Sequence, residues 1–177
     1  MGQEGEKILA KISSFAPVID DAAVILILGS IPGVECLRQG RYYAHPRNAF
    51  WRIIYSLFGV VYPEGESYED KLAFLYGHRI ALWDVIGTCS REGSLDTEIK
   101  DEQPNDFVRL LARYPRIKTV VFNGGKAYET FRRKVGFGTF PDLRYLKMPS
   151  TSPANTKPLA EKLDEWKSLK ESMALGG

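Results

Sequence analysis

One loop of the 177-residue chain gathers residue types that could bind a flat polar ligand. Its first part reads Gly29-Ser30-Ile31-Pro32-Gly33, and its second part runs from Tyr42 to Trp51 as Tyr-Tyr-Ala-His-Pro-Arg-Asn-Ala-Phe-Trp. The glycines allow a tight turn and a close approach of the backbone to a ligand. The adjacent tyrosines could stack on a nucleobase, at ~1–3 kcal/mol per base, and ordinary packing explains them equally well. The loop has neither the Gly-Lys-Ser/Thr ending of a Walker motif nor the glycine spacing of a dinucleotide fingerprint.

Short apolar segments predict the strands that position this loop. Residues 23–28 form a continuous β-branched run, which is typical of a strand buried on both faces. Further strands are expected at residues 79–86, 118–122 and 143–148. Helical spacing or end signals predict helices over 7–15, 50–58, 67–76, 104–114 and 126–135, and a last helix that ends near Leu175. Asn48 can cap the second of these helices, and Ser67 with Asp70 resembles a capping box at the third.

This alternation of strands and helices predicts an α/β fold. We expect three αβα layers around a central, mainly parallel four-stranded sheet, in a single domain over residues 1–177 with its core at about 22–170. Ligand sites in such sheets lie at the carboxyl ends of the strands. Those ends lead into loops 29–48, 84–97, 123–126 and 150–156, which contain most of the unusual polar residues. Asp84 could face the resulting cleft, but a loop-capping aspartate is the simpler interpretation.

Composition fits one ordinary globular core, with 44% hydrophobic and 26% charged residues. No apolar run approaches the length of a membrane span, and no secretion signal is recognisable, so we expect a cytoplasmic protein. Two cysteines and two histidines without close spacing give no reason to expect a metal site. The net charge is only +2, yet residues 29–58 carry +3, residues 117–157 carry +6 and residues 60–102 carry −6. If the basic segments share a face, that face would attract phosphates, although solvated surface is the commoner outcome.

The first loop, together with Ser-Thr-Ser-Pro-Ala-Asn at residues 150–155, resembles the uracil-DNA glycosylase superfamily over about Ile25 to Trp166. Within it, the sequence looks most like the hypoxanthine-DNA (deoxyinosine) glycosylase branch. The resemblance implies hydrolysis of the N-glycosidic bond of a damaged base that is flipped out of double-stranded DNA. It implies no cofactor, no metal and no lyase step, and we expect a monomer that acts on DNA and not on membranes.

By this resemblance Tyr43 is the aromatic residue on which the flipped base stacks, while Gly29, Ser30 and Gly33 shape the pocket. Ile31 stands where related enzymes have an Asn or Asp that positions the attacking water, and isoleucine cannot do so. Asn48 resembles the residue that takes over this task, and an amide would act by orienting water and not as a base. The alternative role of Asn48 is the helix cap described above.

Two further segments receive roles from the resemblance. Asn123 would read the polar edge of the base, because an amide both donates and accepts hydrogen bonds; a turn asparagine before Gly124 is the alternative. Met148 replaces the usual polar residue before Pro149. A DNA-binding role falls to Arg47, Lys126 and the loop Ser150, Thr151, Ser152, Pro153, Ala154 and Asn155, which could contact phosphates and the minor groove. A plain strand-to-helix loop is the alternative for residues 150–155.

The sequence therefore predicts a monofunctional DNA glycosylase that acts on hypoxanthine, with uracil as a second substrate. Three alternatives stay open: a uracil- or mismatch-specific glycosylase of the same fold, a DNA-lesion binder without turnover, and a nucleotide-binding α/β protein that acts on small molecules. The binder is suggested by Ile31 and Met148 at usually polar positions.

Overall fold

A four-stranded parallel sheet forms the centre of the computed structural model, which describes residues 10–175. Its strands are β2 (Ile25–Gly29), β3 (Ile80–Asp84), β6 (Thr119–Asn123) and β7 (Arg144–Met148), in the order β3-β2-β6-β7. All residues of β2 and β6 are buried, as expected for strands with apolar centres and with both faces covered. The predicted α/β class and its four parallel strands are confirmed.

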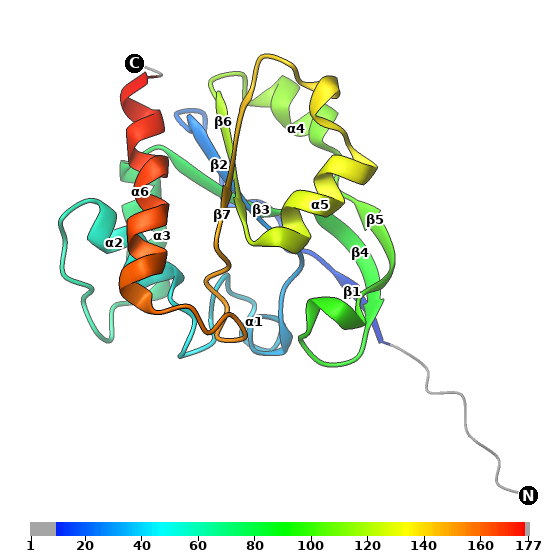
Figure 1. Cartoon of the computed structure of the whole chain (residues 1–177), viewed down its shortest axis with the longest axis horizontal. Coiled ribbons are helices and arrows are strands. Elements are labelled where there is room, and N and C mark those ends of the chain that lie inside the picture. Colours follow the sequence, from blue (N-terminus) through cyan, green and yellow to red (C-terminus); the bar gives the residue numbers. More distant parts are fainter. Residues whose placement is uncertain (1–9, 176–177) are drawn as a thin grey trace, which may run out of the picture.

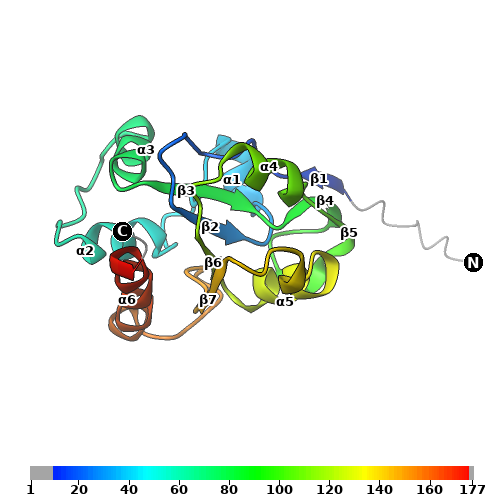
Figure 2. The same cartoon turned by 90° about the horizontal axis from the view of Figure 1, so that it is seen from above.

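Helices cover both faces of this sheet (Figures 1 and 2). One face packs against α2 (Phe50–Leu57), α3 (Tyr68–Gly77) and α6 (Leu159–Leu175). The other packs against α4 (Phe107–Arg113) and α5 (Gly125–Lys134). Each face has its own apolar cluster, because alternate residues of β2 point to opposite sides: Ile25 and Ile27 to the first, Leu26 and Leu28 to the second.

A second, smaller sheet was not expected. It consists of β1 (Ala10–Ser13), β4 (Ile86–Arg91) and β5 (Lys100–Pro104), paired antiparallel in the order β1-β4-β5, with the 3₁₀ turn η1 (Asp96–Glu98) between the last two. The predicted polar loop after β3 is thus largely a β-hairpin. Ile12, Ile86 and Cys89 of this sheet form a separate apolar cluster with Ile99, which precedes β5, and Ile31, which follows β2.

Two predicted helices need correction. The helix over residues 7–15 is wrong where the structure tests it, because residues 10–13 pair with β4 as a strand; residues 7–9 lie outside the described residues. The helix expected from Pro104 begins at Phe107, since Pro104 still belongs to β5 and Asp106 caps the helix through the backbone N–H of Arg109. In both places pairing with a distant strand outweighed the local helical pattern.

Other local signals hold. Ser67 caps α3 by accepting a hydrogen bond from the backbone N–H of Asp70, as the capping box predicted. A short helix, α1 (Val34–Gln39), interrupts the long first loop and ends at Gly40, whose φ is +65°. The second 3₁₀ turn is η2 (Phe137–Thr139), before β7. Among the helices of residues 10–175, none is long and apolar enough to cross a membrane.

The parallel register brings four strand ends to one edge. Gly29 lies opposite Asp84, and Asn123 lies opposite Met148, as the last residues of their strands. In Figure 1, α1 and the loop that precedes α6 lie together beyond this edge. The topology therefore assembles one site from segments that are far apart in the sequence.

Candidate active site

A cavity of about 380 Å³ opens at the carboxyl edge of the parallel sheet. This volume lies in the range of small-ligand pockets. It brings together the predicted base-binding and catalytic residues and the 150–155 loop: Gly29, Ser30, Ile31, Gly33, Tyr43, Asn48, Asn123, Ser150, Thr151, Ser152, Pro153, Ala154 and Asn155 all line it. Arg47 and Lys126 do not line it.

The turn after β2 is held by residues of the second sheet and of η1. The Ser30 hydroxyl donates to Asp96 Oδ1 at 2.8 Å, and the buried Arg91 guanidinium donates to the backbone oxygen of Pro32 at 2.6 Å. Ile31 is only 7% exposed and belongs to the apolar cluster of the small sheet. The second sheet therefore explains why an isoleucine stands at this position: its side chain helps to anchor the turn.

Position 29 has no room for a side chain. A Cβ atom at this position would lie 2.7 Å from Asp84 Oδ1 and 3.5 Å from the Tyr43 hydroxyl oxygen. The first distance is shorter than any ordinary van der Waals contact. The absence of a side chain at Gly29 therefore leaves room for the polar groups of Asp84 and Tyr43 at the bottom of the cavity.

Tyr43 lines the cavity in an uncommon backbone conformation, with φ of +54°. One face of its ring stacks on Phe50, with the ring centres 3.9 Å apart and the planes at 21°. Its hydroxyl oxygen is buried next to the Asn123 amide but has no hydrogen-bond partner among the described residues. Burial, with the nearby Asp84 carboxyl, raises the pKa of Tyr43 above its ordinary value, so the hydroxyl keeps its proton.

Asn48 stands at the start of α2 and at the rim of the cavity. The N-cap of α2 is Ala49 and not Asn48 as predicted, but the Asn48 side-chain oxygen accepts a hydrogen bond from the backbone N–H of Phe50, the first helical residue, at 2.9 Å. A carbonyl oxygen has two lone pairs, and the amide Nδ2 forms no hydrogen bond within residues 10–175. This single bond therefore leaves one acceptor position and two donors of Asn48 for a ligand.

The Asn123 side-chain amide forms two hydrogen bonds with Thr151 of the neighbouring loop. Its Nδ2 donates to the Thr151 hydroxyl, and its Oδ1 accepts from the Thr151 backbone N–H, both at 2.9 Å. The Thr151 backbone oxygen in turn accepts from Ala49 N–H at 3.0 Å. Thr151 thus ties the loop after β2 to the end of β6, and Asn123 retains one donor and one lone pair.

Short-range hydrogen bonds define the shape of the 150–155 loop. The hydroxyls of Ser150 and Ser152 accept from the backbone N–H groups of Ser152 and Ala154, and Asn155 Nδ2 donates to the Ser150 backbone oxygen. Ser150 packs so closely over Gly124 that a Cβ there would lie 3.0 Å from the serine Cβ. Met148, which precedes this loop, is buried in the apolar cluster beneath α2 and α6. Packing therefore accounts for the apolar residue at this position.

Asp84 is a functional candidate for which the sequence favoured a loop-capping role. Its side chain lines the cavity but is only 4% exposed, and Oδ2 has no hydrogen-bond partner among the described residues. The expected loop-capping contact is not present, since it is the Asp84 backbone oxygen that accepts from Asn105. Burial raises the pKa of the carboxyl to about 7, against a smaller opposing effect of Arg91. Its position at the end of a central strand was the available signal.

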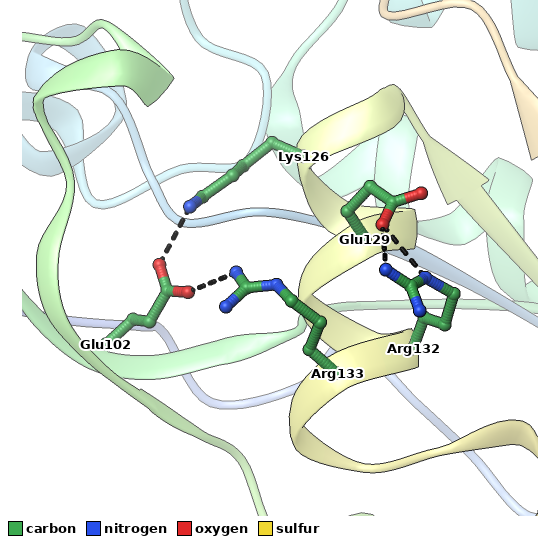
Figure 3. Close-up of polar contacts among 5 residues, drawn as sticks. All are labelled: Glu102, Lys126, Glu129, Arg132 and Arg133. Atoms are coloured by element: carbon green, nitrogen blue, oxygen red, sulfur yellow. Dashed lines mark hydrogen bonds and ion pairs between the residues drawn. The ribbon is translucent and has the colours of Figure 1, made fainter.

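The two basic residues assigned to DNA lie outside the cavity. Arg47 is exposed at the rim, next to Asn48. Lys126 pairs with Glu102 of β5 at 2.8 Å, and Arg133 contacts the same carboxylate at 2.7 Å (Figure 3). One acidic residue from the −6 segment therefore offsets part of the +6 segment. Within residues 10–175, no group of three His, Cys, Asp or Glu residues is arranged to hold a metal ion.

Known proteins resemble this chain over most of its length. Two relatives described as hypoxanthine DNA glycosylases, from Methanosarcina barkeri and Methanosarcina acetivorans, are each 40% identical to it over 88% of the chain, and the matches cover 96% and 95% of those proteins. The solution NMR structure of a Methanosarcina acetivorans protein described as a candidate uracil DNA glycosylase superposes with a TM-score of 0.75 at 38% identity, covering 90% of this chain and 96% of that one. The family described as the uracil DNA glycosylase superfamily matches residues 16–172. The motif resemblance is confirmed, and the chain belongs to the uracil DNA glycosylase superfamily.

Proposed function

We propose that this protein is a monofunctional DNA glycosylase that hydrolyses the N-glycosidic bond of hypoxanthine in double-stranded DNA. The observation that carries the proposal is the cavity that unites Tyr43, Asn48 and Asn123 from three separate segments. The hypoxanthine DNA glycosylases at 40% identity support the choice of base. No lysine among the described residues lines the cavity, which favours hydrolysis by water over an amine nucleophile and a lyase step.

The chemistry requires a positioned water and stabilisation of the departing base. As the bond breaks, positive charge develops on the sugar and negative charge on the base. Asn48 orients the attacking water through its free amide donors and remaining lone pair, while Phe50 N–H holds the side chain in place. An amide is a poor base, so this is catalysis mainly by positioning.

The surrounding segments would hold the DNA. Ser150 and Ser152 use their hydroxyl oxygens as acceptors within the loop, which leaves the O–H groups available to donate to phosphate. Asn123 contributes its remaining donor and lone pair to the base edge. The exposed Arg47, next to Asn48, would contact the DNA backbone. A monomeric state and a cytoplasmic location stay predictions.

Single-turnover excision tests the proposal on duplexes that contain hypoxanthine, uracil or xanthine. We expect wild type to release hypoxanthine and Asn48→Ala to slow release ~10²–10³-fold, the usual loss for one positioned polar group. Asn48→Ser is the matched control, because a serine keeps a side-chain oxygen that can accept from the Phe50 N–H but loses the amide. It should unfold at the wild-type temperature and remain as slow as Asn48→Ala.

Two results would contradict this scheme. Excision by Asn48→Ser at the wild-type rate would show that Asn48 serves only to hold the start of α2. Tight binding of the lesion duplex with no abasic product from any of the three bases would instead identify a lesion binder without turnover. The uracil duplex is included because the structurally similar Methanosarcina acetivorans protein is described as a candidate uracil glycosylase.

A further inference from the structure

Two buried polar atoms at the bottom of the cavity have no partner. Among the described residues, Asp84 Oδ2 and the Tyr43 hydroxyl oxygen are both inaccessible to solvent and form no hydrogen bond. Such atoms are rare in folded proteins because an unpaired buried polar group costs ~1–3 kcal/mol or more. Both belong to residues that line the same cavity, which points to a ligand that supplies the missing hydrogen bonds.

The geometry places these groups next to each other. Gly29 and Asp84 are register partners at the ends of β2 and β3, and the space above Gly29 is shared by the Asp84 carboxyl and the Tyr43 hydroxyl. The Asn123 amide lies next to the Tyr43 hydroxyl and keeps one donor after its two bonds to Thr151, whereas Asp84 Oδ2 has no hydrogen-bond partner among the described residues. Asp84 is therefore the one carboxyl at this point that a ligand could pair with.

Burial, and not a neighbouring charge, favours the neutral form of Asp84. Arg91 of β4 is the nearby cation, yet its guanidinium is bound to the backbone oxygens of Pro32 and Gly93. Tyr42 and Tyr43 face the carboxyl from the loop after β2, and burial raises the pKa of both. The other titratable groups that line the cavity are Glu35 and Cys36 of α1, His45 of the same loop and Asp96 of η1. Burial raises the pKa of Asp84 to about 7, and a base seated above it would exclude the remaining water.

We propose that Asp84 contacts the extruded purine and, in its protonated form, acts as the general acid that protonates the departing base; this inference rests on the proposed glycosylase function. When the C1′–N9 bond breaks, its electron pair moves onto the purine, and a ring nitrogen takes the Asp84 proton. Water adds to C1′ and loses a proton, which restores the neutral carboxyl. The products are neutral hypoxanthine and the abasic sugar. An ionised Asp84 would instead repel the departing anion.

The pH dependence of single-turnover hypoxanthine excision tests this role. We expect the wild-type rate constant to fall ~10-fold or more between pH 6 and pH 8.5, as Asp84 loses its proton. Asp84→Asn has nearly the same shape but no transferable proton, so it should be ~10²-fold slower than wild type at pH 6 and insensitive to pH over this interval. Histidines generally change charge near neutral pH, so His45→Gln is measured alongside and should retain the fall.

A second measurement is independent of turnover. Binding of free hypoxanthine to the protein should weaken ~10-fold from pH 6 to pH 8.5 in wild type and stay constant in Asp84→Asn. Excision that rises with pH, or a fall that Asp84→Asn retains, would overturn the role of Asp84 and leave the glycosylase proposal intact. A wild type that excises no hypoxanthine would overturn the proposed function, while pH-dependent hypoxanthine binding would still identify Asp84 as a base contact.

Discussion

Gly29 is the residue at which space in the cavity is tightest. Since a Cβ atom would lie 2.7 Å from Asp84 Oδ1, Gly29→Ala must displace the carboxyl or the turn. Ser30 and Pro32 are held by Asp96 and Arg91, so the turn has little freedom to move. We expect Gly29→Ala to fold but to lose ~10-fold or more of its single-turnover excision rate, because the Asp84 carboxyl is no longer aligned with the bound purine. An unchanged rate, measured beside Gly33→Ala, would show that the carboxyl can move without consequence.

The raised pKa of Asp84 also predicts how the free energy of unfolding depends on pH. Its pKa rises from an ordinary 3.8 to about 7 in the folded chain, so the folded state holds the proton more tightly than the unfolded state does. The stabilisation is complete below pH 4 and is lost as pH rises through 7. Asp84→Asn lacks this loss, and its free energy of unfolding relative to wild type should increase by on the order of 2–4 kcal/mol between pH 4 and pH 8. Urea denaturation at several pH values measures it, and a pH-independent difference would contradict the burial of an unpaired carboxyl.

At the scale of elements, Thr151 connects three parts of the site. It pairs with the Asn123 side chain at the end of β6 and with the Ala49 backbone just before α2. These bonds position the 150–155 loop relative to Asn48. The active site therefore depends on contacts between loops that follow different strands of one parallel sheet.

Thr151→Val tests this connection because it has nearly the same shape and removes only the hydroxyl. The buried Asn123 Nδ2 would lose its acceptor, which should lower the free energy of unfolding by ~1–3 kcal/mol. Excision should slow as well, since the Asn123 side chain loses one of the two hydrogen bonds that position it, while the backbone bond from Ala49 to Thr151 is kept. Chemical denaturation and single-turnover kinetics measure the two effects. Thr151→Ser keeps a hydroxyl and should restore most of both; equal losses in the two variants would instead implicate the methyl group.

For the whole molecule, charge is distributed unevenly but not as simply as the sequence segments indicate. The chain totals +2, and the +6 segment contains Lys126 and Arg133, which share Glu102. Burial alone would raise the Glu102 pKa, but hydrogen bonds from the two cations hold it below its ordinary value. Glu102 therefore reduces the positive charge that this part of the molecule presents to DNA.

Glu102→Gln should release that charge. We expect tighter binding to undamaged duplex at low salt and a steeper fall of log affinity with log salt concentration, by about one phosphate contact. Fluorescence anisotropy over a salt series measures both quantities. Arg132→Ala and Glu129→Ala are measured in the same salt series for comparison, because these residues form an exposed ion pair on the helix that also contains Lys126 and Arg133. If Glu102→Gln shows the wild-type dependence of log affinity on log salt concentration, Lys126 and Arg133 lie away from the DNA.

The sequence by itself determined the central sheet and most of the site. The apolar runs at residues 25–28 and 120–122 predict buried strands, and the alternation of strands with helices predicts parallel pairing, which places Gly29 and Asn123 at one edge. The Tyr43 and Asn48 motif identified the family and pointed to the same edge. These features are local or follow from chain order, so they could be predicted.

Only the tertiary structure decided the rest. Residues 10–13 became a strand because β4 offered an edge to pair with, and Ile31 was drawn into the apolar cluster which that pairing created. Asp84 and Lys126 are ordinary charged residues in the sequence. Burial without a partner raised the pKa of the first, and Glu102, 24 residues away in the chain, pairs with the second. Protonation and pairing depend on which distant groups come close in space, and that is fixed only when the elements pack together.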